Sequence, residues 1–308
     1  MDRKFSGQIF ESLCRGMTIL ASIVLLFVLG WIFLGGYRTI TWDFLTAEPV
    51  EGMTRGGIFP AIFGTVSVTM LMLVMALPLG VGAAIYLVEY AGDGKAAKII
   101  RAAVNNLAGV PSIVFGLFGV GFFVLFVGRN LDAVLGRGLI FGQPAMLWAA
   151  ATLAVLTLPV VIVTTEEALR AIPLSLREGA YALGATRWQV IRGVVLPQAL
   201  PGILTGAILS VSRGAGETAP ILFTGAAYFL PRLPVAEIPW LGIPMINPLD
   251  QFMELAYHIF IMATQSTNPT ETLPIQYGTT LVLVALTFML NLTAIAMRFV
   301  FRRAVVRR

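Results

Sequence analysis

The segment Pro173–Pro197, PLSLREGAYALGATRWQVIRGVVLP, lies between two long apolar stretches and predicts a short helix, a turn and a second helix. Pro173 suits a helix start, because the first turn of a helix leaves its N–H groups unbonded and proline has none. Gly184 suits the left-handed conformation that commonly ends a helix, and Pro197 prevents a simple continuation of the second helix. The apolar stretches on either side decide the fold class.

The predicted loop has a surface suited to close contact with another protein. Gly179 and Ala180 would let a partner approach the backbone, and Trp188 is a large side chain of the kind that dominates interfaces. A helix that only packs beneath its own bundle would have the same spacing, so spacing alone leaves both interpretations open.

Six apolar stretches exceed the ~20 helical residues needed to cross the hydrocarbon core. They are Met17–Tyr37, Ile58–Val88, Ala102–Gly128, Gly138–Thr165, Val194 to about Ala227, and Thr272–Met297. Only the fifth contains charges, Arg213 and Glu217, and its Gly202 and Gly206 predict close helix packing. The first is too long for a signal peptide and lacks an Ala-x-Ala cleavage site, so we expect a retained anchor. The segment Gln251–Gln265 has helical spacing but is too short to cross, and we expect it along the outer interface.

The composition excludes a soluble globular protein, since 57% of the 308 residues are hydrophobic and 12% are charged, against roughly 25% charged in ordinary soluble domains. The single cysteine, Cys14, and the single histidine, His258, exclude an intrachain disulfide and clustered metal ligands. Gly92–Ala96 lacks the spacing of a phosphate-binding loop and the Ser or Thr after its lysine. We therefore expect no cofactor in this chain, and energy must come from a partner or a gradient.

The net charge of +5 comes from 21 basic and 16 acidic residues. Fifteen basic residues lie in the two terminal segments and in the loops after the second and fourth spans, and five lie in the alternate loops. Because cytoplasmic loops hold the excess of Lys and Arg, we expect both termini in the cytoplasm. The charge thus indicates membrane topology and contact with anionic lipid, not nucleic acid. Glu89 and Asp93, at the inner end of the second span, are expected to be solvated.

The fifth span contains RGAGETAP, Arg213–Pro220. Counted from about Ile203 at ~1.5 Å per residue, Arg213 lies roughly 15 Å into the bilayer, near its middle. A charge there costs at least ~2.5 kcal/mol and usually faces a bundle interior or a wet cavity. Glu217 falls on the same helix face and can pair with it, and Pro220 is expected to kink or end the helix in its outer half. The pair could merely lock packing, but an arginine fork beside a glutamate also suits a phosphate-like anion.

The Pro173–Pro197 segment resembles the EAA loop of ABC importer permeases, whose pattern is E-A-A, three residues, G, nine residues, then I-x-L-P. The positions that match it at the right spacing are Glu178, Ala180, Gly184, Leu196 and Pro197. Gly179 replaces an alanine and Val194 replaces the isoleucine, and both keep small size or β-branching. In that family the loop docks in a groove of the cytoplasmic ATPase, which implies the same coupling role here, with Trp188 as an anchor.

Four further stretches resemble the phosphate-specific permease family PstA. They are GAAIYLVEYA (Gly82–Ala91), NNLAGVPSIVFGLFG (Asn105–Gly119), RGAGETAPILFTG (Arg213–Gly225) and ATQSTNPTETLPIQYGTTLVLVAL (Ala263–Leu286). The sister family PstC shares R-A-x-G-E-T, whereas TAPILFT and QYGT favour PstA. In this family the intramembrane Arg and Glu are implicated in phosphate passage, which the resemblance implies for Arg213 and Glu217; we add the adjacent Thr218 to the predicted pathway.

The resemblance implies an all-α integral membrane protein with six transmembrane helices and the MetI-like type I ABC importer permease fold. It divides the chain into residues 1–57, with the first span and first outer loop, a permease core over residues 58–297, and a basic tail over residues 298–308.

The resemblance also implies an inner-membrane permease subunit that is not itself an enzyme. Its implied partners are a PstC-like permease, two PstB-like subunits that use ATP and Mg, and an extracytoplasmic PstS-like phosphate-binding protein. The alternatives are a permease for another oxyanion, sulfate or molybdate, because a mid-membrane arginine does not distinguish tetrahedral anions, and an ion-gradient symporter or channel.

Overall fold

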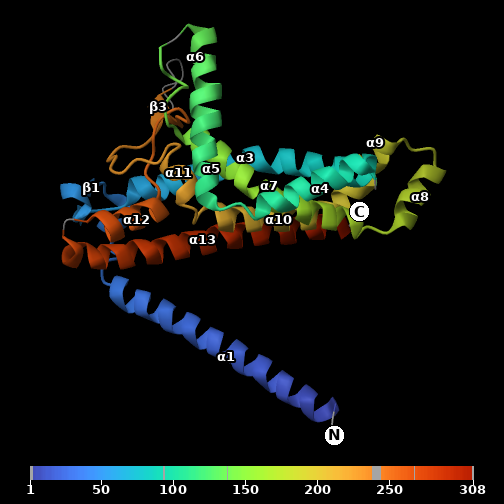
Figure 1. The fold of residues 1–308 in the computed structure, drawn as a ribbon, viewed down its shortest axis with the longest axis horizontal. Helices are drawn as coiled ribbons and strands as arrows, with labels where there is room; N and C mark the ends of the chain where they lie inside the picture. Colours follow the sequence, from blue (N-terminus) through green and yellow to red (C-terminus); the bar gives the residue numbers. More distant parts are fainter. Residues whose placement is uncertain (1–2, 93, 137, 238–243, 267, 307–308) are drawn as a thin grey trace.

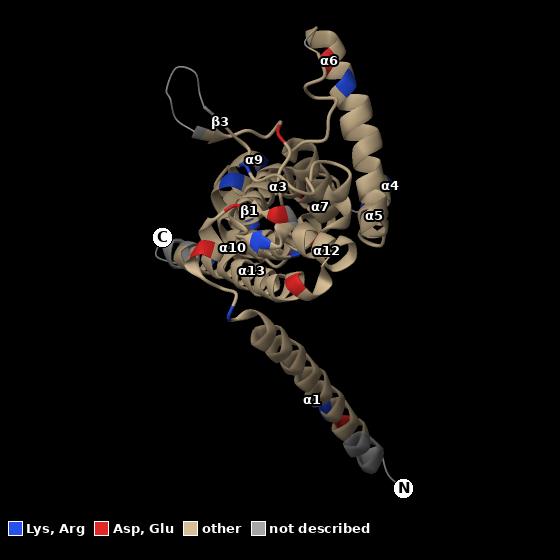
Figure 2. Ribbon diagram, turned by 90° about the vertical axis from the view of Figure 1, so that its left-hand side faces the viewer, with Lys and Arg blue, Asp and Glu red and all other residues tan. Residues whose placement is uncertain are grey.

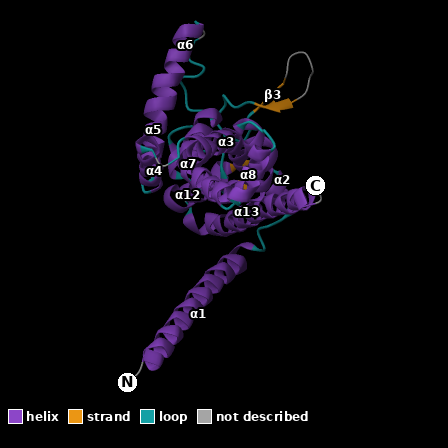
Figure 3. Cartoon of the chain, turned by 90° about the vertical axis from the view of Figure 1, so that its right-hand side faces the viewer, coloured by secondary structure: helices purple, strands orange, loops and turns teal. Residues whose placement is uncertain are grey.

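The computed structural model describes residues 3–92, 94–136, 138–237, 244–266 and 268–306, and it is mostly helical (Figures 1 and 3). The helices are α1 (Arg3–Gly36), α2 (Trp42–Thr46), α3 (Phe59–Ile85), α4 (Lys95–Ala108), α5 (Ser112–Phe118), α6 (Arg129–Leu135), α7 (Met146–Arg170), α8 (Leu174–Ala182), α9 (Arg187–Val190), α10 (Leu196–Gly214), α11 (Ala219–Leu222), α12 (Leu255–Gln265) and α13 (Pro269–Val306). Three π-helical segments extend or join them, Tyr86–Tyr90, Gly119–Gly128 and Ile191–Val195, and Glu51–Met53 forms a 3₁₀ turn. Two short antiparallel strand pairs complete the fold, β1 (Pro49–Val50) with β2 (Arg55–Gly56) and β3 (Val235–Glu237) with β4 (Pro244–Ile246).

The prediction of six membrane spans is confirmed for the described part of the chain. The spans are Phe10–Gly36, Phe59–Tyr90, Ser112–Leu135, Met146–Arg170, Arg187–Gly214 and Pro269–Val300. Figure 2 shows why they suit a membrane, since the long helices are uncharged over most of their length. The predicted basic tail begins inside α13, which continues to Val306, and residues 307 and 308 lie outside the described chain.

The third span begins later than predicted, at Ser112 rather than Ala102. Residues 102–108 belong to a separate helix, α4, which ends at Ala108. Pro111 explains the break, because proline lacks a backbone donor and disfavours helical geometry in the residue before it.

The fourth span also begins later than predicted, at Met146 rather than Gly138. The loop before it is organised by the Asp132 carboxylate, which accepts backbone N–H hydrogen bonds from Ile140, Phe141 and Gly142 at 3.1, 2.9 and 2.7 Å. Because this side chain accepts their N–H groups, residues 140–142 need no helix to satisfy those donors.

The fifth span ends at Gly214, well short of the predicted end near Ala227. The helix was expected to break at Pro220 but ends earlier, because Gly214 and Gly216 already weaken it. Pro220 instead lies in the first turn of α11, a position that tolerates a missing N–H. Between the two helices, residues 215–218 form an irregular turn.

The helix α7 lies at the centre of the bundle, packed against α3 and α10, and is the most buried of the six spans in the described chain. Glycines permit this close approach. Gly202 and Gly206 of α10 lie against Ala168 and Thr164 of α7, where a Cβ on either glycine would overlap its neighbour. The predicted small-residue packing pair is therefore confirmed.

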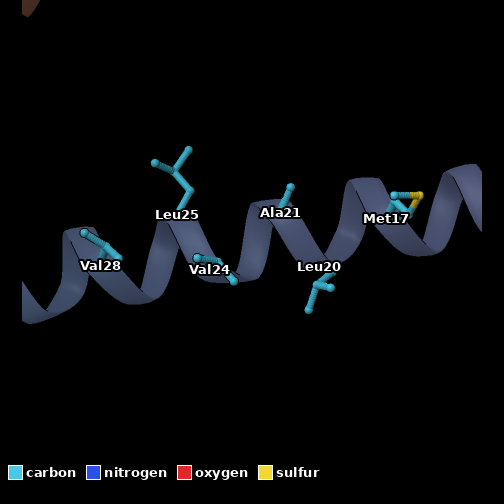
Figure 4. A pocket seen from close by; sticks show the side chains of 6 residues that line it. All are labelled: Met17, Leu20, Ala21, Val24, Leu25 and Val28. Atoms are coloured by element: carbon cyan, nitrogen blue, oxygen red, sulfur yellow. The ribbon is translucent and has the colours of Figure 1, made fainter.

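The helix α1 extends away from the bundle and contacts it mainly through α13 (Figures 1 and 3). Trp31 Nε1 donates a hydrogen bond to the Tyr277 hydroxyl at 3.1 Å, and Gly35 and Gly36 lie against Tyr277. Figure 4 shows a shallow groove along α1 lined by Met17, Leu20, Ala21, Val24, Leu25 and Val28. These side chains are all apolar, so this groove suits lipid or another helix and cannot hold an anion.

The helix α12, expected along the outer interface, is packed against α13 and α3. Its anchor at α3 is Thr65, whose hydroxyl accepts a hydrogen bond from Leu255 N at 3.0 Å. Glu254 and His258 are each 2% exposed and lie outside the six spans. The Glu254 carboxylate accepts the Tyr257 N–H at 2.7 Å and caps the helix.

Burial shifts the pKa values of these two groups in opposite directions. It raises the pKa of Glu254 to about 7 and lowers the pKa of His258 to about 4, because it disfavours the charged form of each. Glu254 therefore contributes stability that is complete below its ordinary pKa of 4.5 and lost as the pH rises to about 7. His258 contributes stability that is complete above its ordinary pKa of 6.5 and lost as the pH falls to about 4.

Between pH 4.5 and 6.5 the two groups change the free energy of unfolding in opposite directions, so we expect little pH dependence in the wild type. Replacing one group should reveal the pH dependence that the other contributes. In Glu254→Gln the free energy of unfolding should rise with pH from about 4 to 6.5, and in His258→Gln it should fall from about pH 4.5 to 7. Each slope should be about 1.4 kcal/mol per pH unit. Denaturation of the purified protein in detergent, measured from pH 4 to 8, gives these slopes.

The control is Glu271→Gln, which removes an exposed carboxyl at the start of α13 and should leave the profile unchanged. If the free energy of unfolding had the same pH dependence in Glu254→Gln and His258→Gln, the pKa values of the two groups would not be shifted in opposite directions.

Candidate functional site

The segment Pro173–Pro197 forms the predicted helix, turn and helix. The first helix is α8, Gly184 has φ +80° in the turn, and α9 begins at Arg187. Thr186 and Gln189 form a capping box, with the Thr186 hydroxyl accepting Gln189 N–H at 3.4 Å and the Gln189 side-chain oxygen accepting Thr186 N–H at 2.7 Å. Figure 1 shows this segment, α8 to α9, protruding from one end of the bundle; we call it the coupling loop after the role that the sequence predicts for it.

The coupling loop leaves large apolar side chains uncovered. Trp188 is 57% exposed and Leu183 is 91% exposed. Glu178, Gly179 and Gly184 are also exposed, whereas Ala180, Leu196 and Pro197 are half-buried. Part of the loop is therefore left uncovered by its own bundle, and its role in docking stays a prediction.

The base of the coupling loop is held by a buried arginine that the motif did not single out. Arg177 Nη2 lies 3.1 Å from Glu89 Oε1, and the side chains of the pair are 11% and 7% exposed. Arg177 also donates to the carbonyl oxygens of Ile172 at 2.7 Å and Leu169 at 2.8 Å.

The expectation that Glu89 is solvated is therefore wrong, because its side chain is buried and paired with Arg177. Asp93, predicted alongside it, lies outside the described residues. The available signal was a carboxylate at the end of an apolar span together with an arginine in another loop, but sequence spacing could not pair two residues so far apart.

Arg213 and Glu217 form an ion pair at the break after α10. Arg213 Nε lies 3.4 Å from Glu217 Oε1, and the side chains are 38% and 19% exposed. The two were expected on one continuous helix, but the helix ends between them, and the turn brings them together instead. Thr218 follows, half-buried.

The position of Gly214 gives the depth of this pair. Gly214 lies against the Met72 sulfur, and Met72 is near the middle of the Phe59–Tyr90 span. Arg213, in the last turn of α10, therefore lies level with the middle of the second apolar span. Beside it, the Ser212 hydroxyl donates to Asn291 Oδ1 at 2.8 Å, which ties α10 to α13. Asn291 lies far along the chain, and sequence reasoning did not connect it with this site.

Comparison with known protein families identifies the family of this chain. Residues 76–307 match the family described as "Binding-protein-dependent transport system inner membrane component". The chain belongs to this family. It is a multi-pass permease of the inner membrane and a subunit of an ABC transporter.

Two relatives and one solved structure extend the match over nearly the whole permease. This chain is 32% identical over 297 residues to "Probable ABC transporter permease protein YqgI" of Bacillus subtilis, and the match covers 96% of this chain and 95% of that protein. It is 33% identical to "Phosphate transport system permease protein PstA 1" of Mycobacterium tuberculosis, covering 92% and 86%. A chain of the bacterial alginate ABC transporter, solved with an alginate-bound periplasmic protein, superposes with a TM-score of 0.62 at 16% identity, covering 95% and 96%. The predicted type I ABC importer permease fold is thereby confirmed.

The turn of the coupling loop should depend on the conformation of Gly184. Gly184→Ala places a Cβ in open space but at φ +80°, which costs about 1–2 kcal/mol for an L-residue. We expect faster hydrogen exchange of the α8 and α9 amides and faster proteolysis of this loop.

The matched control is Gly179→Ala, which also places a Cβ in open space but within α8. It should slow exchange, since alanine stabilises a helix by roughly 0.5–1 kcal/mol over glycine. Equal behaviour of the two variants would show that the left-handed turn does not set loop stability.

Proposed function

We propose that this permease imports inorganic phosphate as one of the two permease subunits of an ATP-driven transporter. The observation that carries the proposal is the Arg213–Glu217 pair at a broken helix near mid-membrane. Irregular backbone at that depth is tolerated only where it is buried in protein or lines a water-filled path. The 33% identity to a phosphate transport system permease supports phosphate as the anion.

The chemistry of the pair suits transient anion binding. The arginine guanidinium presents a planar fork of donors that matches two oxygens of a phosphate group. Glu217 neutralises Arg213 when no anion is present, and its 3.4 Å separation is longer than a strong charge-assisted hydrogen bond. An arriving phosphate would displace the glutamate, and return of the glutamate would release the phosphate.

Partial exposure of Arg213 supports a pathway formed with a second subunit. Its side chain is 38% exposed within this chain, on a surface that a homologous permease would cover. The rest of the complex would comprise two ATPase subunits, which bind ATP and Mg, and an extracytoplasmic phosphate-binding protein at the end of the bundle opposite the coupling loop.

Coupling would run through the exposed loop. Closure of the ATPase pair would move α8 and α9, with Trp188 and Leu183 seated in the ATPase groove. The bundle would then open outward, and phosphate from the binding protein would pass Arg213.

Vesicles that contain the two permeases and the ATPase, with binding protein on the outer side, test this function. We expect uptake of labelled phosphate only with internal ATP. Uptake driven by an ion gradient alone would refute the ABC mechanism for this chain, and uptake of sulfate or molybdate without phosphate would refute the substrate.

Substitution of the pair should separate the roles of its two charges. Arg213→Gln should lower uptake about 10- to 100-fold, because a hydrogen bond to a charged group contributes about 1.5–3 kcal/mol. Arg213→Lys should fall between wild type and Arg213→Gln, because it keeps the charge but not the fork. Glu217→Gln should lower both the maximal rate and the KM, since bound phosphate has lost its competitor.

The matched control is Arg55→Gln. Arg55 pairs with Glu51 at the same spacing and the same 3.4 Å, but its side chain is 75% exposed, in the short strand β2. Normal uptake by Arg213→Gln, or an equal loss in Arg55→Gln, would exclude a pathway role for Arg213.

A further inference from the structure

Both helices of the coupling loop contact one five-residue segment, Tyr86–Tyr90, at the inner end of the second span. From α8, Arg177 Nη2 lies 3.1 Å from Glu89 Oε1. From α9, the Arg187 guanidinium carbon lies 4.8 Å from the Tyr90 ring centroid. Two helices on opposite sides of a turn thus contact adjacent residues of the same element.

The Arg177–Glu89 contact is buried and makes further bonds. Arg177 also donates to two carbonyl oxygens, that of Leu169 in the last turn of α7 and that of Ile172 just after this helix. Breaking a buried ion pair by removing one partner is strongly destabilising, whereas replacing both partners is often neutral. The pair therefore contributes little net stability but fixes where α8 lies relative to α3 and α7.

The contacted segment is π-helical and continues α3 without a break. Single π turns inside α-helices occur frequently at functional sites, because their backbone bonding differs from that of the helix around them. The helix α3 then packs along α7 and α10, and its Met72 lies against Gly214, beside Arg213. About 25 Å of helix separates Glu89 from Met72 at 1.5 Å per residue.

We propose that Tyr86–Tyr90 is the element that receives movement of the coupling loop, with Arg177–Glu89 as its main clamp and Arg187–Tyr90 as the second contact. The clamp makes α8 and α3 move as one body, so that displacement of the loop reaches Met72 and the turn at Gly214. Arg177 and Glu89 are positioning residues that contact neither phosphate nor ATP. The inference rests on the proposed function only in taking the exposed loop as the ATPase dock.

The test uses the assembled transporter in vesicles and compares Arg177→Gln, Glu89→Gln and the double variant. The control is Arg170→Gln, which removes an arginine at the same end of the bundle whose ion-pair partner, Glu166, lies within α7 at 2.8 Å. The readouts are co-purification of the ATPase, the thermal midpoint, ATP hydrolysis, and phosphate imported per ATP hydrolysed.

We expect each single variant to lower the thermal midpoint, because it leaves a buried charge unpaired, and the double variant to recover it. Phosphate imported per ATP should nevertheless fall about tenfold in all three, with ATPase assembly retained, because the clamp is absent in each. Arg170→Gln should keep the wild-type ratio. If the double variant recovers both stability and the transport ratio, the pair only stabilises the fold and the proposal is wrong.

A distance measurement keeps this result separate from the phosphate assignment. Spin labels at Ser175→Cys on α8 and Gly82→Cys on α3 lie at exposed positions, in a Cys14→Ser background that removes the native thiol. With the clamp intact, the distance between the labels should be the same with and without ATP, and in the double variant it should change or broaden.

An ATP-dependent change of equal size in wild type and double variant would overturn the clamp, whatever the transported anion. A constant distance in a transporter that hydrolyses ATP but imports no phosphate would refute the substrate while supporting the clamp.

Discussion

The hydrocarbon core requires every backbone N–H and C=O group within it to find a partner inside the protein, and the rest of this structure depends on that constraint. Six helices satisfy it over most of the chain. One exception in the described chain is the turn after Gly214, which lies at the level of Met72. The helices on either side of the turn are held in the bundle, α10 by α3 and α7 and α11 by α5 and α7.

Charges follow the same constraint. Arg213, next to the break in the fifth span, and Arg177, at the base of the coupling loop, each pair with a glutamate. The pairs differ in exposure, since Arg213 is 38% exposed while Arg177 is 11% exposed. In the accessible pair the arginine can exchange its glutamate for an anion. In the enclosed pair the arginine and glutamate can only hold two elements together. Helix α3 contacts both regions, through Met72 and through Glu89.

Element type was largely predictable because apolar length and helix-ending residues act locally. The six spans, the turn at Gly184 and the packing of Gly202 and Gly206 were expected from the sequence and are found in the structure. The boundaries were less predictable. The carboxylate of Asp132 organises a loop eight to ten residues further along the chain, which delays the fourth span. Gly214 and Gly216 end the fifth span before Pro220.

The sequence by itself determined the class of protein, the family through its EAA loop, and the placement of one arginine and one glutamate within a membrane span. Only the tertiary structure decided that α12 is packed into the fold and that the intramembrane pair lies at a break. It also decided that Glu89 is buried against Arg177. The reason is that hydropathy and spacing act along the chain, whereas these features depend on which distant surfaces cover a side chain, and 88 residues separate Glu89 from Arg177.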